Sequence, residues 1–241
     1  MELEFAERSV TGNVRPSNQD RVLATAAVGT ETWVLAVADG VGGLVDGAEA
    51  SSLTIDGLKA AAVGGGGPLA PRLEARVIEC NSEIFNRGEA NGRPSATTVV
   101  ILAIEGGEFS ALHAGDSRAY LMRDGRIERL TEDHSWVAEQ VRAGSLSPEE
   151  AAANPYRNVI TRAVGVEPSL SVERGESRPC LRGDIYLLCS DGLHGLIDDS
   201  TIATSMALGG GPAVIADRLV ELAIAAGGTD NISVVVGVVT A

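Results

Sequence analysis

The chain has 241 residues, of which 44% are hydrophobic, and a formal net charge of −14 at pH 7. This length is enough for one large domain or two small ones with a buried core. The acidic balance argues against nucleic acids and anionic membranes as partners, because both require a basic surface. The chain has a single lysine, Lys59, and no glycine–lysine–serine/threonine step, which excludes a phosphate-loop NTPase.

The expected elements begin with apolar runs at residues 21–28 and 32–38, which are typical of strands. Two helical segments follow, at residues 48–63 and 69–87, with apolar residues at helical spacing. The glycine-rich stretch 64–68 between them predicts a helix end and a loop.

The middle of the chain predicts two hairpins. Residues 96–104 and 109–114 are strand-like and are separated by Gly106-Gly107. Another strand, 119–123, is followed by Asp124-Gly125, which fits a type I′ turn.

Residues 131–165 are polar and contain short helical pieces, one opened by a capping box at Ser147. We interpret this stretch as a flap over the edge of a site, and the alternative is a solvated connection. The last elements are strands at 184–189 and 232–239 around a helix at 212–226 that ends at Gly227. Strands in hairpin pairs with helices in blocks favour antiparallel sheets covered by helices.

Cysteine usage and the N-terminus favour a cytoplasmic protein. Cys80, Cys180 and Cys189 are unclustered and odd in number, as expected of buried thiols in a reducing cytosol rather than disulfides or zinc ligands. The N-terminus has acidic residues where a signal peptide has basic ones. No apolar run reaches the roughly 18 residues of a membrane span.

Four aspartates occur at the ends of strand-like runs: Asp20, Asp39, Asp191 and Asp230. A carboxylate just beyond a buried strand contributes little to packing. Oxygen ligands of this kind suit Mg²⁺ or Mn²⁺. Arg15 precedes the first aspartate, and its guanidinium suits a phosphoryl group.

The motifs around these residues resemble the metal-dependent Ser/Thr protein phosphatases of type 2C, the PPM family. Any one motif is weak evidence, but six in the family's order are highly specific. The six blocks are Gly12-x-x-Arg15-x-x-Asn18-Gln19-Asp20, Asp39-Gly40-Val41-Gly42-Gly43, Gly115-Asp116-Ser117-Arg118, Asn158-Val159-Ile160-Thr161-Arg162-Ala163-Val164-Gly165, Ser190-Asp191-Gly192-Leu193 and Thr229-Asp230-Asn231.

The resemblance implies an α+β fold of two stacked antiparallel β-sheets flanked by helices, an α-β-β-α sandwich. It implies one domain over residues 1–241 with the flap at about 131–165. Two Mn²⁺ or Mg²⁺ ions are implied, with Asp39 bridging them. Asp191 and Asp230 would complete one ion, Asp20 would help through water, and the Gly40 carbonyl would serve the second.

The implied reaction is attack on phosphorus, in line, by a metal-bridging hydroxide, with Arg15 binding the phosphate. Asp116 with Asp191 resembles a pair that binds a third, weaker ion, and the alternative for Asp116 is a turn-capping carboxylate. Many relatives carry another acid where this chain has Gly195.

Two departures concern proton transfer and charge. Val41 stands where some relatives have a histidine that can serve as general acid, and Gln19 replaces a frequent glutamate. Of the three histidines, we expect His113 to pack within a strand. For His134 and His194 a surface-loop position is favoured over proton donation.

The resemblance implies a bacterial, cytoplasmic, monomeric phosphatase for phosphoserine and phosphothreonine. Its expected partners are phosphorylated proteins and a cognate Ser/Thr kinase whose action it reverses. The alternative is a catalytically silent module that binds phosphoproteins. Loss of a metal-binding aspartate would indicate the silent module, and all the aspartates are present.

Overall fold

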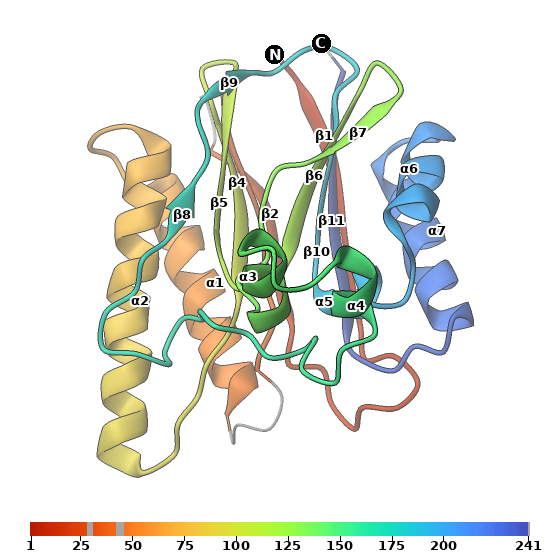
Figure 1. Ribbon diagram of the computed structural model, residues 1–241. Coiled ribbons are helices and arrows are strands. Elements are labelled where there is room, and N and C mark those ends of the chain that lie inside the picture. The colour runs from red at the N-terminus through yellow and green to blue at the C-terminus, as the bar shows by residue number, and fades with distance from the viewer. Residues whose placement is uncertain (28–30, 42–45, 241) are drawn as a thin grey trace.

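The computed structural model describes residues 1–27, 31–41 and 46–240. They form two antiparallel sheets, stacked face to face between layers of helices (Figure 1). The first sheet has the strand order β1 (Leu3–Val10), β11 (Ile232–Val239), β10 (Ile185–Cys189), β6 (Arg118–Arg123), β7 (Arg126–Arg129). The second has the order β2 (Arg21–Ala26), β3 (Thr32–Ala38), β4 (Val99–Glu105), β5 (Glu108–Ala114), β8 (Glu173–Arg174), and β9 (Arg178–Pro179) also pairs with β5. The expected α+β sandwich is confirmed.

The helices cover the two outer faces (Figure 1). The face of the second sheet carries α1 (Gly47–Val63) and α2 (Leu69–Asn91), and that of the first carries α6 (Asp199–Ala207) and α7 (Pro212–Ala225). The short α5 (Asp191–His194) follows β10 directly. Within the flap lie α3 (Trp136–Arg142) and α4 (Pro148–Ala152).

Strand β3 shows why the central strands read as continuous apolar runs. All seven of its residues are buried. Leu35 and Val37 face the core between the sheets, while Val34 and Ala36 face α1 and α2. Alternate side chains point to opposite faces of a strand, and here both faces are covered.

Both predicted hairpins are confirmed. Glu105 pairs with Glu108 across Gly106-Gly107, and the two glycines have φ values of 60° and 81°. At the second turn, Asp124 and Gly125 have φ values of 52° and 74°. Two successive positive φ values define the type I′ turn.

Several elements differ from expectation. Strand β1 was not expected because its side chains are mostly exposed or half-buried, yet it pairs with β11 along its whole length. The short helix α6 was also missed, although Asp198 caps it by accepting a hydrogen bond from Thr201 N–H. Strand β4 begins at Val99 rather than at residue 96.

Cys80 and Cys189 are buried free thiols as predicted, whereas Cys180 is only half-buried.

Among the described residues, no helix has the length and apolar character that crossing a membrane requires. Val28, Gly42 and Gly43, which belong to an expected strand and an expected motif, lie outside the described residues.

Candidate active site

The sheet registers bring the predicted acidic residues to one end of the sandwich. Arg21 pairs with Ala38, so Asp20 and Asp39 lie next to each other just beyond that pair. In the other sheet, Cys189 pairs with Val234. The chain that follows β10 and the chain that precedes β11 therefore reach the same end.

A cavity of about 510 Å³ opens at this end. It is lined by Arg15 and by four aspartates, Asp39, Asp116, Asp191 and Asp230. The rest of its lining comes from Pro16, Ser17, Gln19, Gly40, Val41, Thr98, Asn158, Ile160 and Asn231. Asp20 lies behind these residues and is 2% exposed. The structure thus brings together all the residues that we predicted for the site from the sequence.

Backbone contacts fix Asp39 at the end of β3. Its N–H donates to Thr98 Oγ1 at 3.3 Å, and its carbonyl accepts from Thr98 N at 2.8 Å and from Thr97 Oγ1 at 2.8 Å. The carboxylate therefore projects from a backbone that cannot shift easily. Thr97 and Thr98 were not singled out from the sequence, where they fell within the expected strand 96–104; in the structure they directly precede β4.

Asp191 opens α5 where two backbones approach closely. A Cβ on Gly192 would lie 1.9 Å from Asn231 O, so only glycine fits there. Ser190 Oγ donates to Asp20 Oδ2 at 3.0 Å and accepts from Ser233 N at 3.0 Å. Ser190 thereby links Asp20, at the end of the second sheet, to β11 of the first sheet, a role that sequence reasoning missed.

The loop that carries Arg15 is held by Asn231. Its Oδ1 accepts from Gln19 N at 2.9 Å, and its Nδ2 donates to the carbonyls of Thr11 and Ser17, each at 3.0 Å. Arg15 Nη2 lies 2.6 Å from Asp230 Oδ2. An asparagine that satisfies three backbone groups makes this loop part of the rigid end of the sheet.

Crowding of acids in a buried site raises their pKa values. Burial and the neighbouring Asp20, Asp191 and Asp116 raise the pKa of Asp39 well above its usual range. Burial, Asp230 and Asp20 raise the pKa of Asp191 to about 6. Such carboxylates repel one another until protons or cations neutralise them.

The donor set fits hard divalent cations. Asp20 Oδ1 is buried, and it has no hydrogen-bond partner among the described residues. A buried carboxylate oxygen without a donor is costly unless a cation or water satisfies it. The ligand candidates supply only oxygen, as Mg²⁺ and Mn²⁺ prefer.

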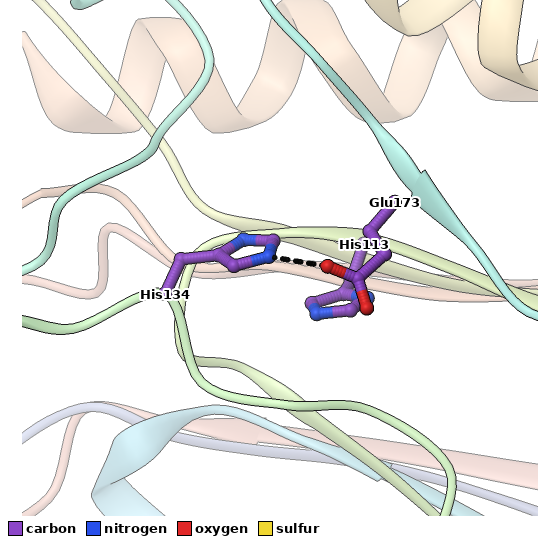
Figure 2. Close-up of side chains that lie close together, drawn as sticks. All are labelled: His113, His134 and Glu173. Atoms are coloured by element: carbon purple, nitrogen blue, oxygen red, sulfur yellow. Dashed lines mark hydrogen bonds and ion pairs between the residues drawn. The ribbon is translucent and has the colours of Figure 1, made fainter. Parts of the chain in front are cut away.

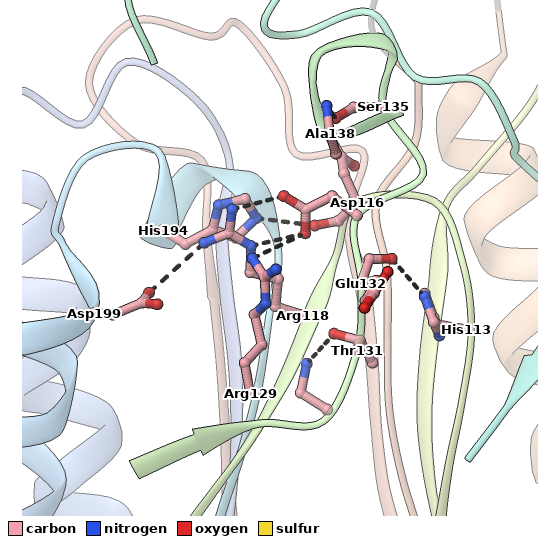
Figure 3. A network of polar contacts seen from close by, with 12 residues as sticks. His113, Asp116, Arg118, Arg129, Thr131, Glu132, Ser135, Ala138, His194 and Asp199 are labelled. Atoms are coloured by element: carbon pink, nitrogen blue, oxygen red, sulfur yellow. Dashed lines mark hydrogen bonds and ion pairs between the residues drawn. The ribbon is translucent and has the colours of Figure 1, made fainter. Parts of the chain in front are cut away.

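Asp116 belongs to a network between the two sheets (Figure 3). Burial and the neighbouring Asp191 raise its pKa to about 8. Two residues on, the Arg118 guanidinium forms a two-pronged ion pair with Asp133, at 2.9 and 2.7 Å. His194 Nε2 donates to the Asp116 carbonyl at 3.0 Å.

The expected surface position of two histidines is wrong. His194 is half-buried beneath the Asp116 loop, and burial and Arg118 lower its pKa to about 3. His134 is buried, at 3% exposure, and its ring stacks on His113. Neither lines the cavity, so neither is placed to protonate a leaving group. His113 packs in β5 as predicted.

The flap reaches the cavity. Asn158 and Ile160 contribute to the lining, while Tyr156 and Val159 are exposed beside them. Trp136 N donates to Val159 O at 2.8 Å, which joins the two ends of the flap. The lining by Asn158 and Ile160 was not predicted, although both belong to the family-like block at residues 158–165.

Comparisons with known proteins agree with this geometry. A family model described as protein phosphatase 2C matches residues 15–208. The serine/threonine protein phosphatase PstP of Mycobacterium tuberculosis is 39% identical over 97% of this chain, which covers 44% of that protein. The chain thus spans about half the length of this relative. Protein phosphatase PhpP of Streptococcus pneumoniae is 34% identical over 96% of both chains.

A solved structure gives the same result. It is the catalytic domain of PstP in complex with two manganese ions, and it is 37% identical with a TM-score of 0.86 over 99% of both chains. The family model alone covers more than half of the chain. The chain therefore belongs to the protein phosphatase 2C family.

Proposed function

We propose that this protein is a Mn²⁺- or Mg²⁺-dependent phosphatase that removes phosphate from phosphoserine and phosphothreonine in proteins. The observation that carries the proposal is the cavity in which four aspartates and one arginine converge. Its membership of the phosphatase 2C family supports the reaction class. The manganese-bound relative supports dependence on a divalent cation.

The acidic groups have distinct tasks in this proposal. Asp39, Asp191 and Asp230 hold two ions, with the Gly40 carbonyl and, through water, Asp20. Asp116 holds a third, weaker ion. When bound, such ions lower the pKa of water to make a nucleophile, polarise the phosphoryl group and offset its charge.

Arg15 orients the phosphoryl group. Its Nη2 contacts Asp230, and the side chain is partly exposed at the cavity. A guanidinium has five N–H donors, so others are available for phosphoryl oxygens. The positively charged guanidinium also stabilises the negative charge that develops on those oxygens.

The flap contacts the protein part of the substrate. Tyr156 and Val159 are exposed next to the cavity-lining Asn158 and Ile160. A phosphorylated side chain that enters the cavity brings its flanking residues against this surface. We further propose a cytoplasmic, monomeric enzyme that opposes a Ser/Thr kinase.

Hydrolysis of a phosphothreonine peptide, followed with Mn²⁺ and with EDTA, tests the function. We expect turnover only with added cation. Asp39→Ala should abolish it while the fold survives, whereas Asp56→Asn, on the exposed face of α1, should leave it unchanged. Full activity after exhaustive chelation would contradict the proposal. Peptide binding without turnover in the wild type would instead support the silent module.

A further inference from the structure

A second polar cluster lies outside the cavity, at the edge of the second sheet. It comprises His113 on β5, His134 in the segment after β7 and Glu173 on β8 (Figure 2). The two imidazole rings stack with centroids 4.4 Å apart and planes 8° apart. His134 Nε2 lies 3.1 Å from Glu173 Oε2. Two imidazoles and a carboxylate are also a familiar ligand set for transition metals.

The hydrogen bonds argue against a cation here. His134 Nδ1 accepts from Gly115 N–H at 3.1 Å. A neutral imidazole that accepts at Nδ1 carries its proton on Nε2. That nitrogen therefore donates to Glu173 and has no lone pair for a metal. Arg162 Nη1 lies 3.0 Å from the same nitrogen. With the proton on Nε2 both groups are donors, so this contact is not a hydrogen bond, but it places a positive charge where the cation would bind.

The same bonds tie His134 to the active site. Besides the Nδ1 contact, His134 N donates to Gly115 O at 3.0 Å, so both polar backbone groups of Gly115 are held by one residue. Gly115 has φ of +119° and packs against Thr98, where a Cβ would lie 2.5 Å from Thr98 Cβ. It directly precedes Asp116.

His134 also binds the far end of the flap. Its carbonyl accepts from Thr161 N at 2.8 Å, and its ring contacts Arg162. On the other side of the loop, His194 donates to the Asp116 carbonyl. The backbone on both sides of the Asp116 side chain is thus anchored by an imidazole.

We propose that His134 is a positioning residue that holds Gly115, and through it the Asp116 carboxylate, at the cavity and couples this loop to the flap. The inference rests on the proposed metal-dependent function. His134 acts through its neutral imidazole ring, which accepts a hydrogen bond at Nδ1 and donates one at Nε2. His134 itself does not line the cavity.

Three variants separate positioning from simple packing. His134→Gln removes the acceptor near Gly115, while His134→Asn keeps an oxygen close to the place of Nδ1. His113→Gln is the matched control, because it disrupts the same stack and the bond from His113 Nε2 to Glu132 O but leaves Gly115 untouched. Residues that orient metal ligands typically affect metal affinity 10- to 100-fold when replaced.

Calorimetric Mn²⁺ titration and the Mn²⁺ concentration for half-maximal p-nitrophenyl phosphate hydrolysis are the readouts. We expect His134→Gln to weaken the weakest Mn²⁺ site about 10-fold. His134→Asn should recover most of that loss, and His113→Gln should bind Mn²⁺ as the wild type does. Wild-type binding by His134→Gln, or equal loss in His113→Gln, would overturn the inference.

A measurement on the wild type covers the case in which the His134 variants do not fold. Nitrogen-15 NMR of the His134 ring should show a proton on Nε2 and none on Nδ1, together with a slowly exchanging Gly115 amide. A proton on Nδ1 would overturn the inference. If the wild type carries the proton on Nε2 but is inactive, the result would count against the proposed phosphatase function and not against the positioning role of His134.

Discussion

Asp191→Asn should stabilise the protein in EDTA at pH 8, although it removes a proposed metal ligand. Burial and the neighbouring Asp230 and Asp20 raise the pKa of Asp191 from its ordinary 3.8 to about 6. This rise corresponds to about 3 kcal/mol of folding free energy as an upper limit. Screening at a half-buried side chain lowers the expected gain to about 1 to 2 kcal/mol.

The sign follows from proton binding. Between pH 3.8 and 6 the folded chain retains a proton on Asp191 that the unfolded chain has lost, so stability falls as pH rises through this window. Above it the penalty is fully present, and the uncharged asparagine avoids it. At pH 5 the gain should shrink to about half of its value at pH 8.

Urea unfolding in EDTA at pH 8 and pH 5 measures the effect, with the exposed Asp56→Asn as control. Saturating Mn²⁺ should reverse the order, because ions that bind the folded wild type stabilise it. A variant no more stable than wild type at pH 8 in EDTA would refute the reasoning, as would a gain that is equal at both pH values.

Three further predictions concern single residues. Arg15→Ala should raise KM for a phosphopeptide about 10- to 100-fold with Mn²⁺ affinity unchanged. Arg15→Lys should restore only part of the lost substrate affinity, because an ammonium cannot make the two-pronged contact. An unaltered KM in Arg15→Ala would make this arginine structural. Arg142→Ala, on the exposed face of the flap, should change phosphopeptide kinetics but not p-nitrophenyl phosphate turnover; equal loss on both would mean that the flap supports the metal site. Gly192→Ala should destabilise the fold by about 4 kcal/mol or more in urea unfolding, because its Cβ would collide with Asn231 O, whereas Gly65→Ala, in open space, should not; similar stabilities would contradict the close approach.

The sequence by itself determined the elements with strong local signals. The apolar run at residues 32–38 became β3 with the predicted bounds, and the glycine-containing turns became type I′ hairpins. The acidic residues of the site were also found from the sequence, because each lies in a short motif next to a strand. Their roles at the proposed metal site stay predictions.

Only the tertiary structure decided what depends on distant partners. Strand β1 has little local signal and is specified by its pairing with β11. His134 and His194 sit in loop-like, polar sequence, yet the backbones of Gly115 and Asp116 supply partners that allow them to be buried. Hydrogen bonds between residues far apart in the chain produce no periodic pattern in the sequence. The burial of such polar groups is therefore decided by tertiary packing and cannot be predicted from the local sequence.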